Sequence, residues 1–488
     1  MKRKHLTLGL LALCVSFTTL GLVACGGGGD DSSSEEHTVH TYENGVCSCG
    51  KSGLAYTLSD DGEYYIVAAA DTTETITGAI VIPDEYEGKP VKEIRRHGFH
   101  STQITEITIG DNVEIIGDNA FNSCEVEKVT LGDSVATIEE AAFLGCEALE
   151  AIEFPASVKS IGQVAFSGCN ALKTLVIPET VETVGKKPFS GNSLESITLE
   201  GKDTVYEGAD GSLQYGTTFA ALPNLKKVAV KEGVENIIGG MFKDCPKLEE
   251  VSLPESIKTI GKYAFSGCTS LEEIDLQSIE TIEAYTFDGC SSLKEIDMQY
   301  VKTIENAAFS RCTALTEIEI PASMETIGNN AFAQCGLTKI VIPNTVKTLG
   351  EGVFSRCENL TEVEIGNGLT TLPEDTFYGA GLKSCIIPEN ITDIQDAAFF
   401  EASSIEWVVI PKSINHIGTS FTYCPNLTAV YYAGTSYEWN QVDKEGSWHS
   451  FSDNVTVYYY AETEDDVVTL NASWHWVDGV PTVWELDY

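Results

Sequence analysis

The stretch Leu248–Ser270, LEEVSLPESIKTIGKYAFSGCTS, is one complete copy of the unit that decides the fold. Its first apolar residues alternate with polar ones, which is the pattern of a short half-buried strand. Pro254 ends that strand, because proline has no N–H to give to a ladder. A second short apolar stretch leads to Gly261, where we expect a turn, and to Phe265. Each unit therefore predicts one parallel strand, a second extended segment and an aromatic side chain that fills the interior.

The phenylalanine of this unit returns fifteen times along the chain. Every step is 22 or 23 residues except one of 30, between Phe189 and Phe219. So short and regular a period is typical of a solenoid, in which each unit buries its apolar face against its neighbours. We predict a β-rich coil of about fifteen units with a parallel sheet on one face and β caps at both ends. The fifteen residues are Phe99, Phe121, Phe143, Phe166, Phe189, Phe219, Phe242, Phe265, Phe287, Phe309, Phe332, Phe354, Phe377, Phe399 and Phe421.

Ten cysteines stand three residues after a repeat phenylalanine. They are compatible with a disulfide or metal array, or with a column of buried thiols that pack as small hydrophobes. Other repeats place Ala380, Ala402 and Leu222 at the same position, and these fill space without crosslinking or binding metal. This substitution favours packing. The ten are Cys124, Cys146, Cys169, Cys245, Cys268, Cys290, Cys312, Cys335, Cys357 and Cys424.

The first residues combine a basic start, an apolar core and the sequence Leu-Val-Ala before Cys25. This resembles the signal peptide of a bacterial lipoprotein. The resemblance implies that residues 1–24 are removed, that Cys25 carries a lipid, and that the folded part is extracellular, on the outer face of a bacterial cell membrane. Residues 25–40 are rich in Gly, Ser and acidic residues, which predicts a flexible tether. We expect membrane contact only through the lipid on Cys25.

The composition is strongly acidic. Without the three basic residues of the signal segment, 27 basic residues face 73 acidic ones, a formal net charge of −46. Nucleic-acid binding is therefore excluded, because it needs a basic footprint. Such a charge favours a cationic partner or a divalent metal ion.

The remaining organisation follows from where the repeats start and stop. We predict an N-terminal cap at 41–91, with a hairpin in Leu54–Val67, and the solenoid at 92–432, with an insert at about 200–212 that protrudes as a candidate contact loop. Residues 433–488 form an aromatic-rich C-terminal cap that shields the last repeat, or alternatively a surface where rings stack on carbohydrate. Five of the six tryptophans lie there: Trp439, Trp448, Trp474, Trp476 and Trp484.

The repeat consensus, with its A-F-x-x-C corner and I-P strand end, is similar to that of the BspA-like leucine-rich repeat proteins of bacterial surfaces. The similarity covers residues near 80 to 432, and the tail Trp474–Trp484, WHWVDGVPTVW, also resembles tails of such proteins. The resemblance implies adhesion to host matrix proteins or to other bacteria. It also implies no common catalytic motif and a ligand that differs between members.

In a strand L-x-x-I-x-I, the residues that flank the middle isoleucine point outward. From the seventh repeat on, most of them are acidic, and strands about 4.8 Å apart would align them in two columns. Acidic residues keep an exposed sheet soluble. Alternatively, they form a docking stripe for a basic protein or for weakly held Ca²⁺, although the repeats contain no dedicated calcium loop. The predicted binding residues are Glu250, Glu273, Asp275, Glu295, Asp297, Glu317, Glu319, Glu362 and Glu364.

Beside this stripe the outward positions become apolar. They are Ile386, Trp407, Val409 and Tyr431. An apolar patch next to an acidic stripe is typical of an interaction site. The alternative is that the C-terminal cap folds over it.

A group of possible zinc ligands stands near the N-terminus: His37, His40, Cys47 and Cys49. Its C-x-C spacing is tighter than the usual C-x₂-C, and a disulfide competes in an exported chain. We predict no cofactor. The many carboxylate pairs invite comparison with a glycosidase, but they are alike and none has an aromatic subsite. We therefore predict a non-catalytic protein that binds an extracellular protein or glycan, with a passive scaffold or a polysaccharide-binding protein as alternatives.

Overall fold

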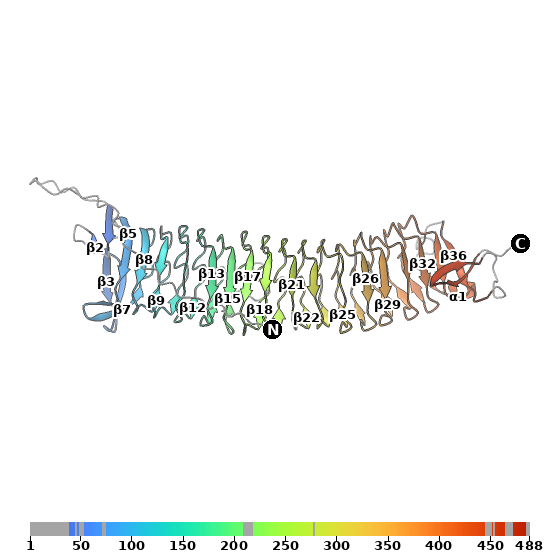
Figure 1. The fold of residues 1–488 in the computed structure, drawn as a ribbon, viewed down its shortest axis with the longest axis horizontal. Coiled ribbons are helices and arrows are strands. Elements are labelled where there is room, and N and C mark those ends of the chain that lie inside the picture. The colour runs from blue at the N-terminus through green and yellow to red at the C-terminus, as the bar shows by residue number, and fades with distance from the viewer. Residues whose placement is uncertain are drawn as a thin grey trace, which may run out of the picture. The chain divides into compact units, whose positions relative to one another are not determined.

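The chain from Val39 to Tyr488 forms one compact unit, a β-solenoid of about 16 turns of about 23 residues. In Figure 1 the turns follow one another in chain order. The predicted β-rich coil is confirmed. Among the described residues the one helix is α1 (Ser436–Trp439). The prediction of lipidation at Cys25 lies outside these residues. This computed structural model describes residues 39–43, 46–47, 53–70, 75–207, 218–276, 279–444, 451, 454–463 and 472–484.

Parallel strands run along a face of the coil that we call the strand face, and their hydrogen bonds group them into several successive sheets. Within each sheet, a strand lies in register with that of the next turn, so that Lys339 is opposite Glu362. Because the side-chain period of a strand is two, this register points the middle residue of every strand into the core. Its strands are β5 (Thr75–Ile82), β8 (Gln103–Ile109), β10 (Lys128–Thr130), β13 (Thr174–Ile177), β15 (Ser196–Leu199), β17 (Lys227–Val230), β19 (Glu250–Ser252), β21 (Glu273–Asp275), β23 (Glu295–Asp297), β26 (Lys339–Ile342), β28 (Glu362–Ile365), β30 (Ser384–Ile386), β32 (Trp407–Ile410), β34 (Ala429–Tyr432) and β36 (Thr456–Tyr460).

A second set of parallel strands, mostly two residues long, runs along another face, which we call the second sheet. In the type unit it is the Thr259–Ile260 pair, with the isoleucine buried. These strands are β4 (Tyr65–Ala69), β7 (Lys89–Ile94), β9 (Ile115–Ile116), β11 (Thr137–Ile138), β12 (Ser160–Ile161), β14 (Thr183–Val184), β16 (Val205–Tyr206), β18 (Asn236–Ile237), β20 (Thr259–Ile260), β22 (Thr281–Ile282), β24 (Thr303–Ile304), β25 (Thr326–Ile327), β27 (Thr348–Leu349), β29 (Thr371–Leu372), β31 (Asp393–Ile394), β33 (His416–Ile417) and β35 (Asp443–Lys444).

The core between the sheets is a column of stacked rings. Each repeat phenylalanine from Phe99 to Phe421 stacks on the next, with ring centroids 4.9 to 5.9 Å apart. All of these rings are buried. An offset stack at this separation adds favourable ring–ring contact to the burial of apolar area, so the column stabilises every junction between turns.

The ten cysteines of the repeat corner lie beside this column as free, buried thiols. Each donates its S–H to the backbone carbonyl of the repeat phenylalanine in the preceding turn, at 2.9 to 3.4 Å. The packing interpretation agrees with this arrangement. The thiol also supplies a weak donor to a buried carbonyl, which alanine at the same position lacks.

The corner between the second sheet and the phenylalanine has a backbone geometry that the sequence pattern did not indicate. Gly261, where we expected a turn, is not in the left-handed region; a Cβ there would lie 2.5 Å from the backbone nitrogen of Gly239 in the preceding turn. Glycine is required at this point by the close approach of two backbones. The left-handed residue is instead Tyr263, two positions before the phenylalanine, with φ of 60°.

The N-terminal region contains the predicted hairpin, formed by β3 (Leu54–Leu58) and β4 in antiparallel pairing. β5 already pairs in parallel with β8, so the coil itself starts inside the region 41–91. β1 (Val39–Glu43) extends this sheet and pairs with β2 (Val46–Cys47), while β6 (Glu85–Tyr86) pairs with β7.

At the other end the coil continues beyond residue 432, where the repeat consensus stops. Phe451 stacks on Phe421 at 5.0 Å, and β35 and β36 pair in parallel with the last repeat strands. The hairpin of β37 (Ser473–Val477) and β38 (Val480–Val483) then ends the sheet. Trp484 donates its backbone N–H to the carbonyl of Ser473 across this hairpin, at 3.0 Å.

In the segment 200–212, which was predicted to protrude as a loop, the described residues 200–207 follow the coil instead. β16 lies within it and pairs in parallel with β14, in the position of a regular second-sheet strand. Tyr206 is buried and contacts Phe219 edge-on at 6.2 Å. Residues 208–217 lie outside the described residues.

Candidate functional site

The acidic stripe lies where the alternation of the strand face predicted it. All of its predicted carboxylates are exposed on β19, β21, β23, β28 and the intervening turn at 317–319. Their outward position follows from the inward position of the middle residue between each pair.

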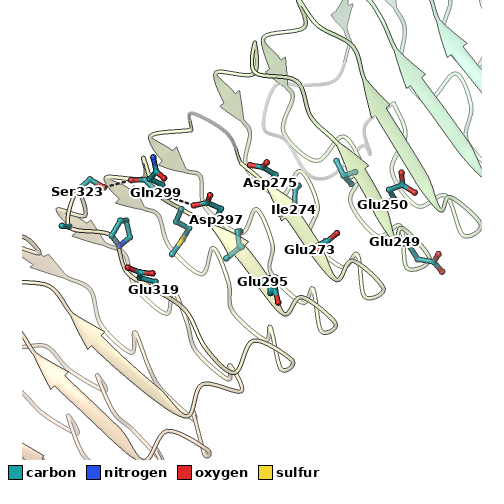
Figure 2. A pocket seen from close by; sticks show the side chains of 15 residues that line it. Glu249, Glu250, Glu273, Ile274, Asp275, Glu295, Asp297, Gln299, Glu319 and Ser323 are labelled. Atoms are coloured by element: carbon teal, nitrogen blue, oxygen red, sulfur yellow. Dashed lines mark hydrogen bonds between the residues drawn. The ribbon is translucent and has the colours of Figure 1, made fainter. Parts of the chain in front are cut away.

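These carboxylates are stacked in register. Glu273 lies directly opposite Glu295, and Asp275 lies opposite Asp297. Figure 2 shows the two glutamates along one side of a groove and the two aspartates along the other, with Ile274 between them. Like charges directly opposite one another in a sheet are destabilising.

Lysines neutralise the two ends of the stripe but not its middle. Lys227 contacts Glu250 at 2.6 Å at one end. At the other end Lys339 lies 3.5 Å from Glu362 and 3.3 Å from Glu364. The hydrogen bond to Glu250 raises the pKa of Lys227, and Glu364 likewise raises the pKa of Lys339.

Between these ends, in the part of the chain that the structure describes, no Lys, Arg or His side chain forms an ion pair with Glu273, Glu295 or Glu317. Lys294, the nearest basic residue in sequence, pairs instead with Glu272 at the edge of the face, at 2.8 Å. Glu273, Glu295 and Glu317, in the middle of the stripe, therefore carry negative charge that no ion pair among the described residues neutralises.

On the second sheet the charged side chains are arranged differently, which the sequence interpretation missed. There, Lys and Glu alternate from turn to turn: Glu235 contacts Lys258 at 2.8 Å, and Glu280 contacts Lys302 at 2.7 Å. The same pattern recurs nearer the N-terminus, at 2.7 and 3.6 Å. The hydrogen bond to Lys258 lowers the pKa of Glu235. Comparing residues 22 or 23 apart would have revealed this alternation in the sequence.

The stripe borders a groove of about 940 Å³ with an apolar floor. Val251 and Ile296, middle residues of their strands, are half-buried there, whereas the equivalent Val228 is 1% exposed. The hydrogen-bonded ladder is also interrupted: β19 ends one sheet, and β21 and β23 form a separate pair. The groove thus combines acidic sides with accessible apolar surface.

The predicted apolar patch is only partly open. Ile386 is 44% exposed and Trp407 is half-buried, and both line a second groove, of about 460 Å³. Val409, expected to be exposed, is buried at 3%. That expectation is wrong because the ring of Tyr431, on the neighbouring strand, packs against the rings of Trp407 and of Trp474 in the C-terminal hairpin. The ring centroids are 6.1 and 5.5 Å apart, respectively. The cap covers the patch from the Tyr431 side.

The C-terminal tryptophans mostly hold the cap together. Trp474 is fully buried and donates its ring N–H to the carbonyl of Tyr432 at 2.9 Å. Trp439 is 7% exposed, and Trp484 bonds the carbonyl of Ala461 at 3.0 Å. Of the tryptophans that the structure describes in this region, Trp476 is the accessible one, at 41%. Trp448 lies outside the described residues.

The zinc candidates fall largely outside the described part. His37 and Cys49 lie beyond it, and His40 and Cys47 are described only as strand residues. Among the residues that were searched, no group of three His, Cys, Asp or Glu is arranged to hold a metal ion. The same described stretches contain no helix that meets the length and hydropathy needed to span a bilayer.

The fold and the open strand face define the class of protein: a leucine-rich repeat solenoid. The model of the BspA type leucine rich repeat region, in six copies, matches residues 92–209, 215–338 and 325–441. The chain belongs to this family, as its repeat consensus indicated, and is a leucine-rich repeat protein of the bacterial surface-protein type. A search of curated proteins found no match.

Solved structures of similar proteins come from several bacteria. A leucine-rich repeat protein from Bacteroides ovatus is 22% identical, over 84% of this chain and 98% of its own, with a TM-score of 0.45. A leucine rich cell surface protein from Faecalibacterium prausnitzii is 24% identical, over 80% and 96%, with a TM-score of 0.37. A leucine rich repeat protein from T. pallidum is 26% identical, over 45% and 88%, with a TM-score of 0.34.

Proposed function

We propose that this protein is a non-catalytic, lipid-anchored surface protein that binds a basic macromolecule along its strand face. The contrast between the two sheets carries the proposal. Where only solubility is required, on the second sheet, Lys and Glu alternate and pair. In the middle of the strand face, Glu273 and Glu295 stack in register, and no described Lys, Arg or His forms an ion pair with either of them. Carboxylates in register destabilise a sheet, and the alternation of Lys and Glu on the second sheet avoids this repulsion. Their presence on the strand face therefore favours a role in binding over a role in solubility.

The partner that fits this face is a protein with a basic, partly apolar surface. Uncompensated carboxylates steer a cationic partner and speed its association. The apolar floor at Ile296 and the half-buried Trp407 supply contacts that become dry on binding. Weak Ca²⁺ binding by the same carboxylates is the second way to offset their charge. Adhesion to host or bacterial surface proteins follows from this surface, with the lipid on Cys25 as the membrane attachment.

The test is binding of the soluble chain, residues 26–488, to extracellular matrix proteins and glycans, with polylysine as the reference cation. Glu295→Lys with Glu317→Lys should weaken binding of basic probes about ten-fold or more, and raised salt should shrink the difference. The matched control reverses two charges on the second sheet, Glu280→Lys with Glu325→Lys, and changes net charge equally.

Equal losses in both double variants would show that total charge alone matters and would refute a site on the strand face. Binding of glycans, unaffected by salt and lost in Trp476→Ala, would favour the polysaccharide-binding alternative. Point substitution is preferable to removing the C-terminal cap, because Phe451 and β36 continue the coil. Absence of binding to every probe would favour a passive scaffold.

A further inference from the structure

Each position of the corner after the repeat phenylalanine can be compared between turns. Two residues after the repeat phenylalanine, the backbone is left-handed, and six turns place glycine there: Gly145, Gly168, Gly191, Gly267, Gly289 and Gly379. Glycine is the residue that adopts this conformation without strain. In the turn of Phe421 the position is Tyr423, with φ of 58° and 70% of its surface exposed. Neither backbone preference nor solubility favours an aromatic residue at this point.

Tyr423 ends a short row of aromatic side chains on neighbouring turns, which we call the aromatic corner: Tyr378, Phe400 and Tyr423. Tyr378 stacks on Phe400 with centroids 5.5 Å apart and planes at 6°. Phe400 meets Tyr423 edge-to-face at 5.1 Å. In several other turns the position of Phe400 holds serine, as at Ser167 and Ser310. The row is therefore a local departure from the repeat.

The other end of the row already holds a cation. The guanidinium of Arg356 lies 5.1 Å from the ring centroid of Tyr378. Tyr378 donates its hydroxyl hydrogen to Glu401 at 2.9 Å, which places a carboxylate beside the rings. Lys243 lies over Tyr263 in a similar way, at 5.5 Å, on another corner. The negative face of an aromatic ring attracts such cations.

We propose that Tyr423 binds an arginine or lysine side chain of a basic partner protein, as Tyr378 binds Arg356. Among the described residues, the cations placed over rings lie over Tyr263, Tyr378 and Trp439, and Tyr423 itself is 70% exposed. Glu401 adds charge complementarity. This inference rests on the proposed function for the class of partner, and it adds a second contact outside the strand face.

The test uses an arginine–glycine repeat peptide and its citrulline analogue, which has nearly the same shape but no charge. Binding of the labelled peptides to residues 26–488 is followed by fluorescence anisotropy. Tyr423→Gly should weaken binding of the arginine peptide by roughly 2- to 30-fold and leave the citrulline peptide unchanged. Tyr423→Phe should retain the affinity, because the ring face is kept. The matched control is Tyr437→Ala, which removes another tyrosine, 74% exposed, on α1.

Misfolding does not confound the glycine variant, since glycine relieves the left-handed strain at this position. An unchanged affinity of Tyr423→Gly for the arginine peptide, or equal losses for both peptides, would overturn the inference. The same measurements in the Glu295→Lys, Glu317→Lys background separate the two proposals. If only the charge reversals weaken binding of the arginine peptide, the strand face alone is its binding site. If only Tyr423→Gly weakens binding, the aromatic corner alone is its binding site.

Discussion

Raising the pH from about 7 to about 10 is expected to unfold the coil, because its buried thiols resist ionisation. Burial raises the pKa of five of them to about 12, and these thiols remain protonated in the folded chain. In the unfolded chain, cysteine has a pKa of about 8.5. Stability from these groups is therefore fully present below about pH 8.5 and is lost as pH rises toward 12. The five are Cys169, Cys245, Cys290, Cys385 and Cys424.

The size of the effect follows from linkage. One pKa unit corresponds to about 1.4 kcal/mol, so at about pH 10 each such thiol lowers the free energy of unfolding by about 2 kcal/mol. Five thiols give about 10 kcal/mol, which is comparable to the whole stability of a typical domain. Because a solenoid is stabilised turn by turn, turns that contain a buried thiol should open before turns that lack one.

The assay is denaturant unfolding under reducing conditions at both pH values, followed by circular dichroism, with thiolate absorbance recorded in parallel. Cys290→Ala is the informative variant, since alanine occupies this column naturally at Ala380 and Ala402. At about pH 7 it should be less stable by roughly 1–2 kcal/mol, through the lost contact and hydrogen bond. At about pH 10 this difference should vanish or reverse. Thiolate formation near pH 9 with an unchanged circular dichroism spectrum would refute the reasoning.

Two further predictions concern single positions. Val164 is a β-branched residue at φ of 47°, so Val164→Gly should raise the free energy of unfolding by about 1 kcal/mol in denaturant titrations; a loss would show that its side-chain contacts outweigh the strain. Arg311 holds Asp288, whose side chain is only 11% exposed, through contacts of 3.0 and 2.6 Å. Arg311→Ala should lower the free energy of unfolding by roughly 1–3 kcal/mol, whereas Lys339→Ala, which removes an exposed ion pair, should lower it by less than about 1 kcal/mol. Similar losses for both variants in denaturant titrations would contradict the importance of burial.

The period of the sequence by itself determined the architecture. Each unit contacts copies of itself 22 or 23 residues away, so a local pattern specifies long-range pairing. For this reason the column of phenylalanines, the parallel strand face and the outward carboxylates such as Glu273 and Glu295 were all predictable. Alternative strand registers compete poorly with the native one, because a shift of one residue would turn every apolar side chain of a strand outward.

Only the tertiary structure decided what happens where the repeat weakens. The continuation of the coil to Phe451 passes through residues without the consensus, and packing against Phe421 supplies what the pattern lacks. Val409 has the sequence position of an exposed residue but is buried at 3%, because the aromatic cap closes over Tyr431. The aromatic corner at Tyr423 likewise depends on contacts between side chains of neighbouring turns. Such contacts depend on rotamers and on packing against non-repeating segments, neither of which a period encodes.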